Sequence, residues 1–278
     1  MSKKSKSLAK ELTPKIVVEA SSRYMESYNR LKDNIIYSSD NGRKKVFQVE
    51  SAVSGEGKSS VVANTAVLLA KSGKKVVVVD LDFRRPKMHM IFDMPNINGI
   101  AEYMLDECAK EDLVKTTKYG VYVVNRGKSI HNASIVFTSE KFKNLIEELK
   151  KEFDFVLFDC PPVLLVSDYI HYSVLADETI FIASVGVTRR SQLMEACELM
   201  RKCNPNILGI VITHKNQGNK AYKYGSNYYY KGYYGSRKYL EGSDNDWYSL
   251  TFTAFYWWRK RFFRKIRLSY KKSSWWRG

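Results

Sequence analysis

Short apolar runs alternate with longer amphipathic segments through most of the chain. The segment 75–80 contains four consecutive valines, and 155–159 is almost as apolar. Strands that are apolar on both faces are typical of parallel sheets covered by helices on both sides. The pattern predicts strands at 46–53, 75–80, 122–124, 155–159, 177–185 and 207–213, and helices at 17–37, 58–70, 139–151 and 190–203.

This alternation of strands and helices indicates the fold class. Successive strand–helix–strand units form right-handed crossovers and build a parallel sheet. We therefore expect an α/β, doubly wound, mostly parallel sheet over residues 17–216. Ligands of such sheets bind beyond the carboxyl ends of the strands.

The composition changes at both ends of this domain. Residues 1–16 form a basic N-terminal arm, and residues 217–248 are rich in tyrosine, glycine, serine and asparagine with almost no aliphatic side chains. Such a segment buries too little apolar surface to offset its ordering entropy, so we expect a flexible tail. Residues 249–278 form a basic aromatic extension for which we expect disorder or contact with a membrane surface.

Charge narrows the class of partner. The chain has 278 residues, with 46 Lys and Arg against 29 Asp and Glu, giving a net charge of +17. Nine of these basic residues lie between 250 and 278, which contain no acid. Because the excess is concentrated at the ends, a nucleic-acid-binding surface over the whole domain is disfavoured, and no specific nucleic acid is expected.

Cysteine usage and the N-terminus indicate a cytoplasmic location. The four cysteines form no C-x-x-C pair, which favours reduced thiols over disulfides or a zinc site. The first fifteen residues lack the apolar region of a signal peptide, and no run approaches the length of a membrane span.

A phosphate-binding loop follows the first predicted strand. Its residues precede and open a predicted helix, which is the context that a P-loop requires. Backbone N–H groups and the helix N-terminus would face phosphate oxygens, with Lys58 at the β- and γ-phosphates and the Ser59 hydroxyl on Mg²⁺. The expected nucleotide-binding residues are Ser54, Gly55, Glu56, Gly57, Lys58, Ser59 and Ser60.

Three carboxylates stand at the ends of predicted strands. Asp80 and Asp82 follow the valine run, and Asp159 ends the strand at 155–159. The carboxyl ends of parallel strands meet at one sheet edge, where the P-loop also lies. Several acids at one place are costly without a cation, which favours a nucleotide-bound Mg²⁺ there.

These motifs carry a family resemblance. The P-loop, Asp80-Leu81-Asp82-Phe83-Arg84, Asp159-Cys160-Pro161-Pro162 and the tyrosine-rich segment together resemble the bacterial tyrosine kinases, which are relatives of the deviant-Walker ATPases. The resemblance implies a P-loop NTPase fold and transfer of phosphate from ATP, with Mg²⁺, to tyrosine. It is nearest to the capsule and exopolysaccharide kinases whose catalytic chain is separate from its membrane activator.

The resemblance also implies roles for single residues. Lys58, Asp80, Asp82 and Arg84 would be catalytic, and Ser59, Asp80 and Asp159 would hold the metal. Either Asp80 or Asp82 would accept the tyrosine proton, with Asp80 preferred, and Arg84 would stabilise charge or bind the acceptor. The expected phosphoacceptors are Tyr222, Tyr224, Tyr228, Tyr229, Tyr230, Tyr233, Tyr234 and Tyr239.

Partners follow from the same resemblance. It implies a transmembrane polysaccharide co-polymerase adaptor that activates the kinase, a cognate tyrosine phosphatase, ring-like self-association, and a place at the inner face of the cell membrane. Three positions, in two motifs, depart from the family. Asn29 and Lys32 replace arginines of an early-helix association motif, and Thr213 replaces an asparagine that reads adenine.

The residues also allow other functions. One alternative is a positioning or partitioning ATPase without kinase activity, and another is an inactive regulatory scaffold. The strand-end acids and the tyrosine cluster favour the kinase. For the basic aromatic extension, single-stranded nucleic acid is a further alternative to a membrane surface.

Overall fold

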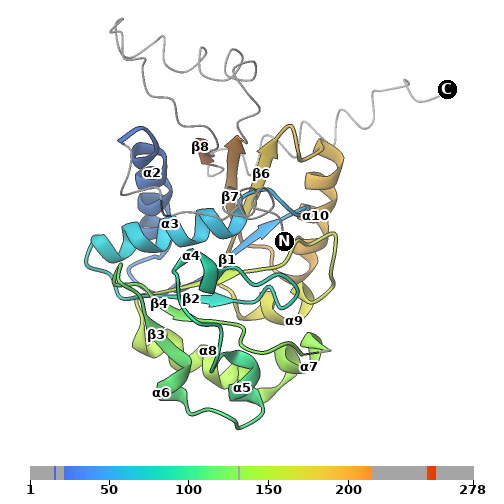
Figure 1. Ribbon diagram of the computed structural model, residues 1–278. Helices are drawn as coiled ribbons and strands as arrows, with labels where there is room; N and C mark the ends of the chain where they lie inside the picture. Colours follow the sequence, from blue (N-terminus) through green and yellow to red (C-terminus); the bar gives the residue numbers. More distant parts are fainter. Residues whose placement is uncertain (1–15, 17–21, 131, 215–248, 255–278) are drawn as a thin grey trace, which may run out of the picture.

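A computed structural model describes residue 16 and residues 22–130, 132–214 and 249–254 (Figure 1). Eight strands form one sheet in the order β3-β4-β2-β5-β1-β6-β7-β8. Five neighbouring pairs are parallel, and the edge strands β3 and β8 are antiparallel. The strands are β1 (Val46–Ser51), β2 (Val76–Asp80), β3 (Val114–Thr116), β4 (Tyr122–Val124), β5 (Phe155–Asp159), β6 (Glu178–Val185), β7 (Ile207–His214) and β8 (Ser249–Ala254).

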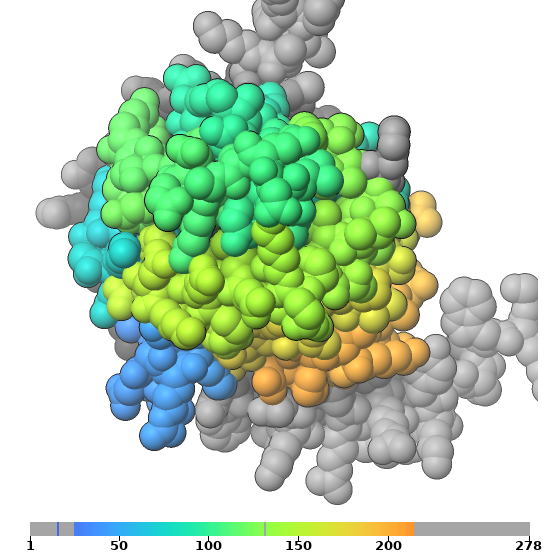
Figure 2. All heavy atoms as spheres, turned by 90° about the horizontal axis from the view of Figure 1, so that it is seen from below, coloured from blue at the N-terminus to red at the C-terminus, as the bar shows by residue number. Residues whose placement is uncertain are grey.

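Helices cover both faces of this sheet. One apolar core lies between the sheet and α2, α3 and α4, and a second lies between the sheet and α7, α8, α9 and α10. The segments from α5 to α8 form a continuous face, green to yellow-green, when the molecule is seen from below (Figure 2). The helices are α2 (Ser22–Ser38), α3 (Lys58–Lys71), α4 (Met88–Ile91), α5 (Ile100–Met104), α6 (Lys110–Leu113), α7 (Ala133–Thr138), α8 (Glu140–Glu152), α9 (Tyr169–Tyr172) and α10 (Arg190–Cys203), with a 3₁₀ turn at Ser173–Leu175.

The predicted fold class is confirmed. Every predicted strand and helix is present: β4, β5 and α10 have the predicted bounds, and the other described ends differ by at most two residues. The predicted start of the first helix, at 17, lies outside the described residues. The central strands, such as β2 and β5, are buried on both faces. Strand β1 ends at Ser51 rather than 53, because the chain turns there into the P-loop. The short helices and the edge strands β3 and β8 were not predicted.

The segment boundaries stay predictions. Residues 1–15 of the N-terminal arm, the tyrosine cluster and residues 255–278 lie outside the described residues. Strand β8 falls within the segment assigned to the basic aromatic extension, where it pairs with β7. His214 and Ser249 are paired residues of these two strands, so the tyrosine-rich segment leaves and rejoins the sheet at the carboxyl end of β7.

In the part of the chain that the structure describes, no helix combines the length and apolar character needed to cross a bilayer.

Candidate functional site

The P-loop joins β1 to α3 at the carboxyl edge of the sheet. Gly55 and Gly57 have φ values of 87° and 88°, a left-handed conformation that glycine adopts at little cost. A Cβ atom at Gly55 would meet nothing within 4 Å, so open space lies beside the loop. Gly57, the N-cap residue of α3, has no side chain to cap the first turn, which leaves the N–H groups there available to an anion.

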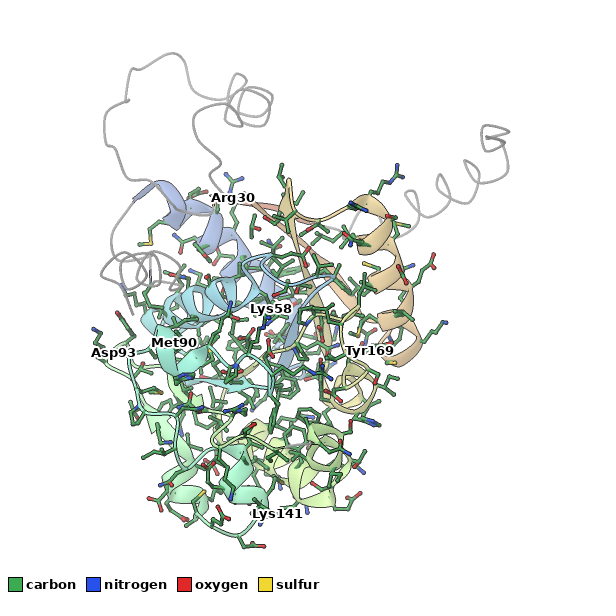
Figure 3. The ribbon with its side chains drawn as sticks, turned by 45° about the vertical axis from the view of Figure 1, so that its right-hand side comes forward. Arg30, Lys58, Met90, Asp93, Lys141 and Tyr169 are labelled. Carbon is green, nitrogen blue, oxygen red and sulfur yellow. The ribbon has the colours of Figure 1, made fainter. Side chains whose placement is uncertain are left out.

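Lys58 lies at the start of α3, in the middle of the molecule (Figure 3). Its ammonium group forms a buried ion pair with Asp159. Burial alone would lower the pKa of Lys58, but the charges of Asp159 and Asp82 outweigh it and hold the pKa above its ordinary value. The P-loop lysine is thus ion-paired with the acid at the end of β5.

Asp80 lies beside Asp159, because the two residues are paired across β2 and β5. Its Oδ2 accepts hydrogen bonds from the backbone N–H groups of Lys87 and Met88, each at 3.0 Å, and its Oδ1 accepts one from Asp82 at 3.2 Å. Burial and then the charge of Asp159 raise the pKa of Asp80 to about 8. Asp80 therefore anchors the loop that follows β2, and it holds its proton more tightly than an ordinary aspartate while no cation is present.

Asp82 is the third acid, and it lies on that loop. Its Oδ1 accepts a hydrogen bond of 2.9 Å from the backbone N–H of Arg85. Arg84, two residues further along the chain, is exposed at the surface. The structure therefore brings Lys58 and the three acids together and leaves the predicted Arg84 at the rim.

The residues present fit a magnesium-bound nucleotide. The Oδ2 atom of Asp159 is buried and has no hydrogen-bond partner among the described residues. Three carboxylates surround a single buried ammonium, which leaves an excess of negative charge that favours a divalent cation. Ser59 and Asp159 offer the oxygen ligands that Mg²⁺ prefers, and Lys58 and the loop amides suit phosphate oxygens.

Two groups near this site were missed at the sequence level. Glu50, on β1, is fully buried, and burial raises its pKa to about 8 against the opposing charge of Lys58. Neither carboxyl oxygen makes a hydrogen bond of ordinary geometry within the described residues, although the Tyr172 hydroxyl and the Cys160 thiol lie close enough to lower the pKa. No local motif distinguishes such a glutamate from an exposed one.

Arg126 is the second missed group. It follows β4, and its guanidinium donates a hydrogen bond of 2.9 Å to the backbone oxygen of Phe83. The Phe83 ring packs edge-on against Phe137, with 5.1 Å between ring centroids. Arg126 and Phe137 both lie outside the Asp80–Arg84 motif, and their contacts with Phe83 stabilise the loop that carries Asp82.

The predicted association motif lies on α2. Arg30 is exposed near the end of the molecule that carries α2 (Figure 3). It forms an ion pair of 3.0 Å with Glu26, and Lys32 forms one of 3.1 Å with Asp33. Asn29 is partly exposed. Self-association through this helix stays a prediction.

Comparison with known proteins agrees with the site. A family model described as an AAA domain matches residues 44–207. The tyrosine-protein kinase YwqD of Bacillus subtilis (strain 168) is 32% identical over 222 residues, which cover 80% of this chain and 90% of the relative. The putative tyrosine-protein kinase CapB of Staphylococcus aureus is 30% identical over 211 residues, which cover 76% of this chain and 90% of the relative.

A solved structure supports the same grouping. The crystal structure of the chimerical protein CapA2B2 matches with a TM-score of 0.68 and 28% identity, over 71% of this chain and 88% of that chain. The tyrosine kinase relatives favour the kinase over the positioning ATPase. On its fold, its motifs and these likenesses, the chain belongs to the bacterial tyrosine kinase family.

Proposed function

We propose that this chain transfers the γ-phosphate of ATP to tyrosines of its own segment 217–248. The observation that carries the proposal is the buried pair of Lys58 and Asp159, set between the P-loop and the acid Asp80. Phosphoryl transfer depends mainly on positioning and on neutralising charge, and a lysine beside strand-end acids supplies both.

Nucleotide binding would exchange the partner of Lys58. The triphosphate offers the ammonium a stronger anion than one carboxylate, so Lys58 would bind the phosphates and leave Asp159 free. Ser59, Asp80 and Asp159 would then hold Mg²⁺, which would neutralise phosphate charge when bound. A cation would also lower the pKa of Asp80, which is raised while the metal is absent.

The contacts favour Asp82 over Asp80 as the acceptor of the tyrosine proton. Both oxygens of Asp80 accept backbone hydrogen bonds of its own loop, whereas Asp82 accepts one through Oδ1 alone among the described contacts. A phenol with a pKa of about 10 needs such a carboxylate nearby to lose its proton at neutral pH. We therefore propose Asp82 as the base, where the sequence alone favoured Asp80.

The position of the tyrosine segment supports its role as the acceptor. The described residues on either side of the segment, His214 and Ser249, are paired across β7 and β8 at the sheet edge that carries the P-loop. An extended chain spans roughly 3.4 Å per residue, so a segment of this length reaches tens of ångströms.

We propose that the phosphate is transferred in trans, from the active site of one copy to the tyrosine segment of another. Each phosphate adds a charge of about −1.5 to −2, so several would make the segment acidic and separate the copies.

The cellular role extends the same proposal. The kinase would regulate synthesis, chain length or export of a capsular polysaccharide or exopolysaccharide at the inner face of the cell membrane. A transmembrane co-polymerase adaptor would activate it, a tyrosine phosphatase would reverse it, and the weakened motif on α2 would limit ring-like self-association. Arg84, exposed at the rim, would contact the acceptor.

Labelled ATP tests the proposal. The full chain is incubated with [γ-³²P]ATP and Mg²⁺, with and without a cytoplasmic adaptor fragment, and phosphopeptides are mapped. We expect label on the tyrosines between Tyr222 and Tyr239, weak alone and strong with the adaptor. ATP hydrolysis without any phosphotyrosine would instead support the positioning ATPase.

A further inference from the structure

The P-loop is held by residues at and just after the carboxyl ends of β6 and β7, the two strands that follow β1 in the sheet order. We propose that the hydroxyl groups of Thr188 and Thr213 are positioning groups that hold the P-loop, through Glu56, in its phosphate-binding shape before the nucleotide arrives. The inference rests on the proposed function only in taking this loop as the nucleotide site.

Glu56 is the centre of the arrangement. Its side chain is 1% exposed, although glutamate on a loop is ordinarily solvated. One carboxylate oxygen, Oε2, accepts a hydrogen bond of 2.8 Å from the backbone N–H of Val53, which closes the loop on itself. The other oxygen, Oε1, accepts a short hydrogen bond from the Thr188 hydroxyl. Glu56 therefore joins the start of the P-loop to the segment after β6.

The orientation of the Thr188 hydroxyl is determined by its second contact. The backbone N–H of Ser184 donates a hydrogen bond of 2.7 Å to Thr188 Oγ1. A hydroxyl carries a single proton, so this proton is directed to the Glu56 carboxylate. The backbone N–H of Thr188 also donates to the Ser184 oxygen at 2.9 Å, which fixes the turn after β6. Thr188 is thus a rigid donor, because its hydroxyl and its backbone N–H are both hydrogen-bonded to Ser184 at the end of β6.

Thr213 holds the same P-loop residue at its backbone. It is fully buried at the end of β7, and its hydroxyl donates a hydrogen bond of 2.7 Å to the backbone oxygen of Glu56. Thr213 and Ser184 are paired residues of β7 and β6. Thr188, after β6, and Thr213, at the end of β7, therefore both hydrogen-bond to Glu56, which lies two positions before Lys58.

The two hydrogen bonds to Glu56 are expected to affect nucleotide binding. A loop that must turn its N–H groups toward phosphate loses conformational entropy when it does so, and contacts that fix the loop beforehand reduce that loss. A hydrogen bond to a charged group is among the stronger kinds in proteins. Loss of the Thr188 hydroxyl would therefore weaken nucleotide affinity roughly tenfold, with a smaller effect on the rate at saturating ATP.

Matched threonine substitutions test the proposal. Thr188→Val and Thr213→Val remove the hydroxyl and keep the shape, whereas Thr188→Ser and Thr213→Ser keep the hydroxyl. The control is Thr138→Val, which removes an exposed hydroxyl bonded to the Ser134 backbone within helix α7, away from Glu56. The Kd of Mg²⁺·ADP is measured by calorimetry, the labelling rate at saturating ATP by phosphotyrosine detection, and amide hydrogen exchange at Val53 and Gly57 in the nucleotide-free full chain.

We expect each valine variant to raise the Kd about tenfold and to speed exchange at the two loop amides, while the serine variants and Thr138→Val remain near wild type. Unchanged Kd and unchanged exchange in a valine variant would overturn the proposal, as would serine variants as weak as the valine ones. Should one valine variant fail to fold, the other carries the same prediction. If the wild type binds Mg²⁺·ADP but labels no tyrosine, the proposed function fails while the Kd comparison still decides this inference.

Discussion

The buried glutamate on β1 gives a quantitative prediction about stability. Glu50 is fully buried, and its pKa rises from 4.5 to about 8, chiefly through burial. Glu50→Gln replaces a group that is protonated in the native state with one of the same shape that never ionises. We expect this variant to be more stable than the wild type at neutral pH.

The magnitude follows from proton linkage. At pH 7 the Glu50 carboxyl is ionised in the unfolded chain and protonated in the native state. The free energy of unfolding is therefore about 3 kcal/mol lower than it would be with a permanently neutral group at this position. Because the native pKa is raised, the free energy of unfolding of the wild type falls as pH rises from about 4.5 toward 8. The free energy of unfolding of Glu50→Gln therefore exceeds that of the wild type by about 1 kcal/mol at pH 5, and the difference vanishes at lower pH.

Urea unfolding of both proteins at pH 5, 6, 7 and 8, without nucleotide, measures this difference. Asp80 also titrates with a raised pKa, but it is present in both proteins, so its effect cancels in the comparison. Glu178→Gln is the control, since that side chain is ion-paired with Lys44 and its neutralisation should not stabilise. A Glu50→Gln variant with the same pH dependence as the wild type would refute the reasoning.

Three further predictions concern the site and the thiols. Lys58→Met should abolish tyrosine labelling while its circular dichroism spectrum stays that of a folded domain; labelling at the wild-type rate would refute the site. Asp82→Asn should slow labelling with little change in the Kd of Mg²⁺·ADP, whereas Asp80→Asn should weaken that Kd, and the reverse result would exchange the two roles. Burial raises the pKa of the Cys160 thiol well above its ordinary value and that of Cys197 to about 12, so Ellman's reagent should label two of the four cysteines in native protein and all four after unfolding.

Local signals explain what could be predicted from the sequence. The valine run of β2 and the Gly57-Lys58-Ser59 turn are contiguous, and each determines its own conformation. The meeting of Asp80 and Asp159 followed from a general rule of parallel sheets, and their pairing across β2 and β5 agrees with it.

Contacts between distant residues explain what could not be predicted. The Glu56 carboxylate meets Thr188 across 132 positions of sequence, and neither residue type indicates the other. Edge strand β3 is three residues long and partly exposed, so it carries too little periodicity to be recognised. The burial of Glu50 depends on the helices packed over β1, which no window of its own strand contains.

The most direct test of the account is a crystal structure of the full chain with Mg²⁺ and ADP. The account predicts nucleotide phosphates on the loop amides, the Lys58 ammonium moved from Asp159 to the phosphates, and Mg²⁺ among Ser59 and the strand-end acids. Nucleotide bound elsewhere, or Lys58 still paired with Asp159 beside a bound nucleotide, would contradict it.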